Sequence, residues 1–212
     1  MIFGSLFGGN SREDTPAVAV VRDITIGRQV RLDALAWRRL SGAAFTLDRD
    51  TLEITAQGLI RLDDGSHVHR FYTDDELMLQ AVSQSADGSD ADDFTLFRPW
   101  SSTYPVDRSD TAAFRDRLSR PTWDEAGLAR FDRFWYPGDD RTQPPVELWE
   151  SVYEERTGRP VRHIKQACML YAREVPPEGQ ELLLALAMQP EGGDLTHEIM
   201  VGLPLLPAEF SA

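Results

Sequence analysis

Four runs of strand-forming residues fill the C-terminal part of the chain: residues 146–155, 163–173, 180–189 and 195–203. Turn-forming sequences such as Val175-Pro-Pro-Glu-Gly179 separate them. Consecutive strands joined by short turns favour antiparallel pairing. No glycine-rich nucleotide loop and no metal-ligand motif lies between the runs. The pattern therefore predicts a packed, largely antiparallel β domain, but it names no chemistry.

The N-terminal half carries a similar signal from Thr51 onward, where apolar residues recur with a period of two. One face of this strand is predicted to hold Leu52, Ile54, Ala56, Ile60 and Leu62. The Asp63-Asp-Gly65 turn then predicts a hairpin to a return strand over residues 67–72. Further strands over residues 77–83 and 94–97 complete a predicted β-meander.

Shorter elements are predicted outside the two strand-rich stretches. Residues 18–26 predict a first strand, and residues 131–136 predict another. Asp33 is placed to cap a short helix that ends at Leu40.

A second helix is predicted to begin at Ser109 or Asp110 and to pair Phe114 with Leu118 on its apolar face. The fold class predicted from these elements is α+β, predominantly antiparallel β with one or two short helices. Its two strand-rich halves are expected to pack together.

The predicted domain organisation is an N-terminal tail over residues 1–16 and one globular β-rich domain over residues 17–212. The domain has candidate halves at 17–100 and 129–212, and either one sheet system or two small domains would fit them. On one helical face the tail groups Ile2, Phe3, Leu6 and Phe7. These side chains suit docking on a partner protein or peripheral membrane contact through residues 1–9, while a frayed terminus is the plainer alternative.

Composition limits the classes of partner. The formal net charge of −13 argues against nucleic-acid binding, which requires lysine and arginine to neutralise phosphates. No run of 18 or more apolar residues predicts a membrane span. Cys168 is the single cysteine, so no intrachain disulfide can form, and its apolar surroundings favour an inert buried thiol. We therefore expect a cytoplasmic protein.

Sequence motifs for common cofactors and metals are missing. The chain has no phosphate-binding loop, no dinucleotide fingerprint and no serine-nucleophile elbow, so no cofactor is expected. His67 and His69 would point the same way from one strand and are weak candidates for a metal site. A third ligand is not apparent near them, and a polar strand face is the alternative interpretation.

Carboxylates offer a candidate acid–base site. Glu150 and Glu154 on one predicted strand, or Asp139 and Asp140 in the preceding loop, could form the pair that glycoside or peptide hydrolysis requires. Carboxylates at this spacing are also common on exposed strand faces.

Aromatic residues concentrate between positions 94 and 153. Most of them are expected to fill a core between the two strand-rich halves. Four lie beside proline-marked loops and are the candidate binding residues: Trp100, Tyr104, Trp135 and Tyr136.

Several short stretches together resemble the YjfK-type family of bacterial proteins of unknown function. They are the Phe/Leu/Gly-rich start, Ile54-Thr-Ala-Gln-Gly58, Asp63-Asp-Gly65, His69-Arg-Phe-Tyr-Thr-Asp-Asp75, Pro144-Pro-Val146, Val152-Tyr-Glu154 and Gly202-Leu-Pro-Leu205. The resemblance implies a soluble bacterial protein encoded near a phage-shock-protein-A-like coiled-coil protein, a small membrane protein and an ATP-grasp ligase-like enzyme. It transfers no catalytic residue.

The function predicted from the sequence is a non-catalytic protein-interaction module. Its expected partner is a protein, with a phage-shock-protein-A-like coiled-coil protein implied by the resemblance, and a link to envelope or membrane stress is implied in the same way. The alternative is an unrecognised hydrolase that acts on sugar or peptide through paired carboxylates.

Overall fold

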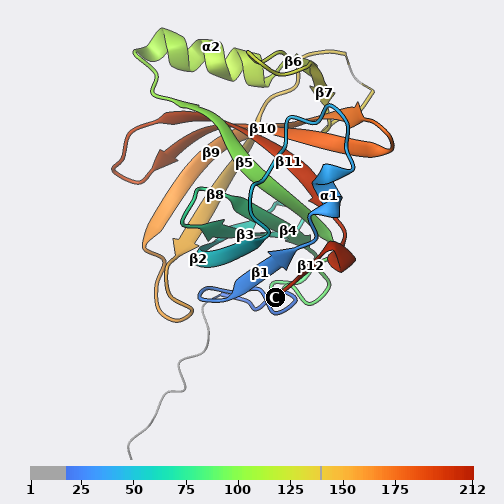
Figure 1. Ribbon diagram of the computed structural model, residues 1–212. Coiled ribbons are helices and arrows are strands. Elements are labelled where there is room, and N and C mark those ends of the chain that lie inside the picture. The colour runs from blue at the N-terminus through green and yellow to red at the C-terminus, as the bar shows by residue number, and fades with distance from the viewer. Residues whose placement is uncertain (1–17, 139) are drawn as a thin grey trace, which may run out of the picture.

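Eight antiparallel strands of the computed structural model close into a barrel (Figure 1). The structure describes residues 18–138 and 140–212. In order around the barrel, the strands are β2 (Thr51–Arg61), β3 (His67–Thr73), β4 (Met78–Ser83), β5 (Asp93–Thr103), β11 (Thr196–Leu205), β10 (Gly179–Pro190), β9 (Arg162–Val175) and β8 (Val146–Tyr153). Each strand pairs antiparallel with both of its neighbours, so the ring has no free edge.

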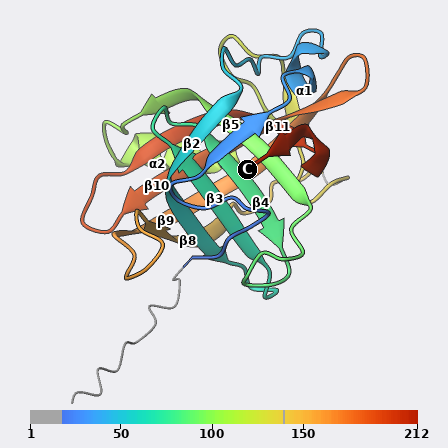
Figure 2. The same cartoon turned by 60° about the horizontal axis from the view of Figure 1, so that its bottom comes forward.

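Two non-local joins close the ring. β2 pairs with β8, with Gly58 opposite Val152, and β5 pairs with β11, with Phe97 opposite Gly202. The predicted N-terminal meander forms, the four predicted C-terminal strands form a second meander, and the two make the two sides of one closed sheet. Figure 2 shows the strands of both meanders arranged around the barrel.

Smaller elements lie on the outside of the barrel. Near the chain ends these are β1 (Gln29–Leu32), α1 (Leu35–Arg38), the 3-10 turn η1 (Pro207–Glu209) and β12 (Phe210–Ser211). Between the meanders these are α2 (Arg108–Leu118), β6 (Thr122–Trp123) and β7 (Phe131–Arg133). β1 pairs with β2 and β12, while β7 pairs with β9 and α2 packs on β9 and β10 (Figure 1).

Two apolar clusters attach these outer elements to the barrel. One cluster joins the N-terminal segment to the outer faces of β2 to β5, with Trp37 and Phe45 packed edge to face. The other joins α2, β6 and β7 to β9, β10 and β11 around Trp123, Phe131 and Tyr171. Because the outer faces are covered in this way, both the inward-facing and the outward-facing residues of the covered strands are often apolar.

A buried ion pair holds the N-terminal segment against the outside of the barrel. The Glu181 side chain is 0 % exposed and accepts hydrogen bonds from Arg173 Nε at 2.8 Å and from the Phe45 backbone N–H at 2.6 Å. Arg173 also donates to the Gly42 carbonyl at 2.8 Å. The loop that carries Phe45 is therefore tied to β9 and β10 by charge-assisted hydrogen bonds.

The first predicted strand is wrong. Residues 18–26 contain only an isolated bridge between Val21 and Ile24. Arg22 and Asp23 between them adopt φ angles of 46° and 67°, which makes a tight turn instead of an extended strand. The apolar signal came from Val21 and Ile24, which are both fully buried.

Both predicted helices exist, with different bounds. α1 spans a single turn, although Asp33 Oδ1 does accept from the Leu35 backbone N–H at 2.9 Å. The N-cap of α2 is Asp107, whose side chain accepts from the backbone N–H groups of Ser109 and Asp110. The strand predicted over residues 131–136 ends at Arg133.

Candidate functional site: the barrel interior

A layer of polar side chains crosses the middle of the barrel. Arg70 of β3 and Glu150 of β8 form an ion pair with 2.9 Å between Nη1 and Oε2, and their side chains are 3 % and 0 % exposed. Arg70 Nη1 also donates to Gln166 Oε1 of β9 at 2.8 Å, and Gln166 Nε2 donates to Glu150 Oε2 at 2.5 Å. The charges of this pair cancel within the interior, where an isolated charge would be costly.

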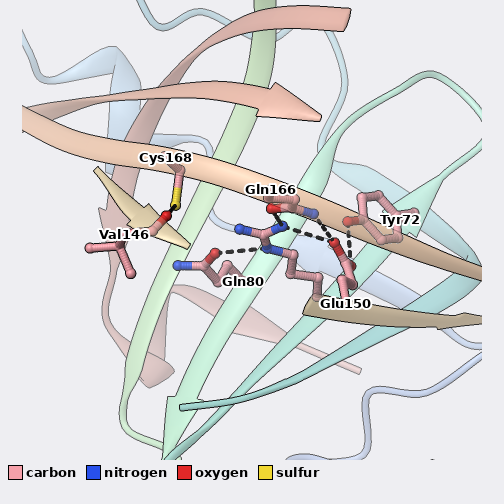
Figure 3. Close-up of polar contacts among 7 residues, drawn as sticks. Tyr72, Gln80, Val146, Glu150, Gln166 and Cys168 are labelled. Atoms are coloured by element: carbon pink, nitrogen blue, oxygen red, sulfur yellow. Dashed lines mark hydrogen bonds and ion pairs between the residues drawn. The ribbon is translucent and has the colours of Figure 1, made fainter. Parts of the chain in front are cut away.

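Two further residues extend the layer (Figure 3). Tyr72 donates from its hydroxyl to Glu150 Oε1 at 2.6 Å, and Gln80 Oε1 accepts from Arg70 Nε at 3.1 Å. Burial raises the pKa of Tyr72 well above its ordinary value, and the charge of Glu150 adds to this effect. Burial lowers the pKa of Arg70, but the charge of Glu150 raises it together with Tyr72 and Cys168, and the net shift of the pKa is upward. The layer is therefore a fixed, ionised pair with a neutral phenol beside it.

Gly58 makes the space in which Glu150 lies. An added Cβ at Gly58 would stand 1.7 Å from Glu150 Oε1, so no larger residue fits without displacing the carboxylate. Gly58 pairs with Val152 across the β2–β8 join, two residues beyond Glu150. A glycine in a strand interior has its physical reason here, because another group approaches its backbone closely.

On one side of this layer the barrel holds a cavity of about 700 Å³, which we call the leucine end. Apolar side chains dominate its wall, including Phe97, Trp135, Leu148, Leu170, Leu182 and Leu184. Asp64 and Asp93 lie at its mouth, and Arg70, Gln80, Thr95 and Gln180 also contribute polar groups to its lining. Desolvation raises the pKa of Asp93, and the charge of Asp92 raises it further.

On the other side of the layer lies a second cavity of about 730 Å³, which we call the methionine end. Met78, Met188 and Met200 line it together with Tyr72 and Arg70. Four charged residues also line it: Glu76, Glu154, Arg162 and Glu198. Arg162 pairs with Glu154 at 3.7 Å, and Glu198 accepts from the Ser102 hydroxyl at 2.7 Å. Arg70 thus contributes to both cavities and separates them.

Two hydrogen-bond donors in the polar layer are unused. Arg70 donates from Nε and Nη1, which leaves Nη2 without a hydrogen bond among the described residues. Within the same part of the chain, Gln80 uses only its carbonyl oxygen. Its amide nitrogen points away from the guanidinium in Figure 3. Because Gln80 lines the leucine end, this cavity contains donors that a bound molecule could satisfy.

Comparisons with known proteins give a family. A family model described as "Protein of unknown function (DUF2491)" matches residues 2–211. The chain belongs to the DUF2491 family. No curated protein and no solved structure matches it. The match does not confirm the resemblance to the YjfK-type family. Among the described residues of this DUF2491 chain, no helix is both long and apolar enough to cross a membrane.

The four aromatic residues predicted to bind fall in three places. Trp135 and Tyr136 both line the leucine end. Tyr104 is 69 % exposed and lines a smaller hollow beside α2, together with His197. Trp100 packs between the two outer clusters and donates from its indole N–H to the Ala126 carbonyl at 3.2 Å. The structure therefore brings together one pair of the four.

Only four of the eight other aromatic residues of this region are buried in the core, which is fewer than expected. Phe94, Phe97, Trp123 and Phe131 are at most 1 % exposed, whereas Trp149 is 57 % exposed on the outer face of β8. α2 covers β9 and β10, and it reaches the outer face of β8 through the ion pair of Arg115 with Glu147.

His67 and His69 lie on β3 with ring centroids 6.5 Å apart. His69 is fully buried and its ring Nε2 lies 3.1 Å from the Ser83 hydroxyl. Burial lowers the pKa of His69, and the nearby His67 lowers it further. Within the part of the chain that the structure describes, no three His, Cys, Asp or Glu side chains gather to hold a metal ion.

The carboxylates predicted as an acid–base pair have different environments. Glu150 is bound by Arg70, Gln166 and Tyr72, whereas Glu154 is 57 % exposed and pairs with Arg162. The two carboxylates therefore do not share hydrogen-bond partners, and Glu150 is held on both oxygens by neighbouring side chains. Asp139 lies outside the described residues, as do Ile2, Phe3, Leu6 and Phe7 of the tail.

The thiol of Cys168 lies beside the polar layer (Figure 3). Its Sγ is 3.6 Å from the Val146 carbonyl oxygen, and burial raises its pKa to about 12. A thiol with this pKa stays protonated near neutral pH, so Cys168 is not an activated nucleophile.

Sequence reasoning missed Arg70, Gln80 and Gln166. A signal for them is present at inward positions: Arg70 stands between Val68 and Tyr72 on alternate positions of β3. Gln166 likewise stands between Ile164 and Cys168 on β9. Polar residues in register with apolar neighbours on one strand face indicate a buried polar network.

Proposed function

We propose that this protein is a non-catalytic binding protein that holds a small molecule in the leucine end of its barrel. The observation that carries the proposal is the cavity of about 700 Å³ inside a closed eight-stranded barrel. Its size is that of a drug-sized ligand site, and barrels of eight strands are wide enough to hold one small ligand.

The chemistry of the wall supports binding rather than reaction. A mostly apolar wall with a few polar groups is the usual make-up of a ligand pocket. The Glu150 carboxylate of the polar layer is held by Arg70, Gln166 and Tyr72 and does not line this cavity. Trp135 and Tyr136 add flat apolar surface at this end.

Two matched substitutions on β10 test the proposal. Leu184 and Leu186 point into the barrel two residues apart and are 2 % and 1 % exposed, but Leu184 lines the leucine end and Leu186 lines the methionine end. N-phenyl-1-naphthylamine, an uncharged dye that fluoresces in apolar sites, should bind the full-length protein. We expect Leu184→Trp to fill the leucine end and to weaken dye binding at least about tenfold, because the indole ring occupies the space that the dye needs.

Leu186→Trp is the control, because it adds the same side chain on the same strand face. It should leave the dye affinity within about twofold. Thermal unfolding of both variants checks that they fold. Equal loss in both variants, or no binding by the unmodified protein, contradicts the proposal.

A protein partner is a second candidate function, and the outer face of β8 favours it. Trp149 is 57 % exposed there and lies between Glu147 and Ser151 on the same face of the strand. An exposed tryptophan ringed by polar groups suits a protein-binding surface. The implied partner is a phage-shock-protein-A-like coiled-coil protein, and the stress link follows from it.

A pull-down with purified coiled-coil protein tests this candidate. The intact chain should retain the partner, and Trp149→Ala should reduce retention several-fold because the hot-spot side chain is gone. A version without residues 1–10 separates the contribution of the tail. Retention that neither change reduces would count against both surfaces.

A further inference from the structure

The leucine end contains more than apolar volume, because its floor carries unsatisfied donors. Arg70 is 2 % exposed as a residue, and its Nη2 has no hydrogen bond among the described residues. Nη2 and Nε share one edge of the guanidinium, and the Nε partner, Gln80, lines this cavity. The Gln80 amide nitrogen is a second donor on the same floor. Both nitrogens are open to the cavity rather than sealed from it, so an acceptor on a bound molecule can reach them.

Acceptors are scarce on the same floor. Gln80 Oε1 is already occupied by Arg70, and both Glu150 oxygens accept bonds from Arg70, Gln166 and Tyr72. The free groups that face the cavity from the layer are therefore N–H groups. Their complement is an oxygen that accepts hydrogen bonds, such as a carbonyl.

Charge balance decides what kind of oxygen fits. The single positive charge of Arg70 is already cancelled by Glu150 at 2.9 Å. A ligand carboxylate on Nη2 would place two negative charges beside one guanidinium in a site shielded from water. Asp64 and Asp93 at the mouth repel it further, and among the described residues that line this cavity Arg70 is the only basic one.

We infer that the leucine end takes an uncharged apolar molecule that carries a carbonyl, with its oxygen bound by Arg70 Nη2 and the Gln80 amide nitrogen. This inference rests on the proposed function and specifies its ligand class. Phe97, Leu182 and Leu184 hold the apolar body. Fatty-acid anions, which would present a carboxylate at the same depth, are selected against.

The test compares two probes of the same length, decanamide and decanoate, each competing with N-phenyl-1-naphthylamine for the full-length protein near neutral pH. The dye carries no acceptor oxygen, so it reports the apolar volume alone. Decanamide should bind at least about tenfold more tightly than decanoate, because only decanoate brings a second negative charge into the site.

Two variants test the contact atoms. Gln80→Met removes one donor at similar volume and should weaken decanamide about fivefold. Arg70→Met combined with Glu150→Gln removes the other donor while keeping the layer neutral, and should weaken decanamide about tenfold or more. Dye affinity within about twofold of the unmodified protein shows that both variants keep the cavity.

The outcomes separate the two ideas. Decanoate binding as tightly as decanamide overturns the ligand class, and unchanged decanamide affinity in both variants overturns the contact atoms. In either case the proposed function still holds if the unmodified protein binds the dye and Leu184→Trp abolishes that binding. A protein that binds neither dye nor decanamide overturns both.

Discussion

The two ends of the barrel are built from the same strands, yet they differ in chemistry. On β10, Leu182 and Leu184 face the leucine end, whereas Leu186 and Met188 face the methionine end. The leucine end has a rigid, apolar wall and unused donors at its floor. The methionine end has flexible side chains and a mouth with three carboxylates and one guanidinium. The chemical character of the inward side chains therefore changes along each strand, from one side of the Arg70–Glu150 layer to the other. It does not change from one strand to the next.

This comparison teaches that a buried ion pair can partition a barrel. The desolvation of two charges offsets much of their attraction, so the pair contributes little net stability. Its clearer effect is positional, because it holds β3, β8 and β9 in one register and prevents apolar side chains from filling the centre. The second buried pair, Arg173 with Glu181, holds an outer loop and encloses no cavity.

The largest expected effect is on stability and contrasts two carboxylates of β8. Glu150→Gln should lower the free energy of unfolding by about 3–5 kcal/mol, because it leaves the Arg70 charge buried without a partner. Glu154→Gln, at an exposed position of the methionine end, should change it by no more than about 0.5 kcal/mol. Urea unfolding measures both. Similar losses in the two variants would mean that the buried carboxylate contributes no more to the free energy of unfolding than the exposed one.

A smaller effect is expected at the mouth of the leucine end. The pKa of Asp93 is raised in the folded state, so the folded protein binds this proton more tightly than the unfolded chain does. Stability is then lost as the pH rises from below the ordinary value of 3.8 through the raised pKa, and the loss persists at neutral pH. Asp93→Asn should therefore make the protein slightly more stable at neutral pH and no more stable in acid.

The same substitution also separates the two ends by binding. Removing the Asp93 charge should raise decanoate affinity at the leucine end by about twofold, because one repulsive charge is gone. Glu198→Gln removes a charge from the methionine end and should leave decanoate affinity unchanged. Equal gains in both variants would indicate a general charge effect instead of a local one.

Much of the fold follows from local pattern. The Asp63-Asp-Gly65 turn and the period-two residues around it are sufficient to predict the first hairpin, and β3 and β4 follow in register. Residues 18–26 show where such reasoning fails, because Val21 and Ile24 are buried by a turn rather than by a strand. Burial alone does not determine the backbone conformation of a short apolar segment.

The site is less accessible from sequence than the fold. Trp135 and Tyr136 could be selected because they stand beside prolines, and both line the leucine end. The polar layer could not be assembled, because Arg70, Glu150 and Gln166 come from three strands whose neighbours are set by the closure of the barrel. Alternation predicts which residues face inward, but only the non-local joins determine which inward residues meet.

The β2–β8 join also dictates an order of assembly. β2 ends at Arg61 and β8 begins at Val146, so a nascent chain must carry an open first meander until the later strand has emerged. During that interval residues 57–60 of β2 and residues 94–103 of β5 lack their later partner strands, and such open edges are the kind of surface that other chains can pair with. Docking of the second meander pairs both edges and so removes this surface.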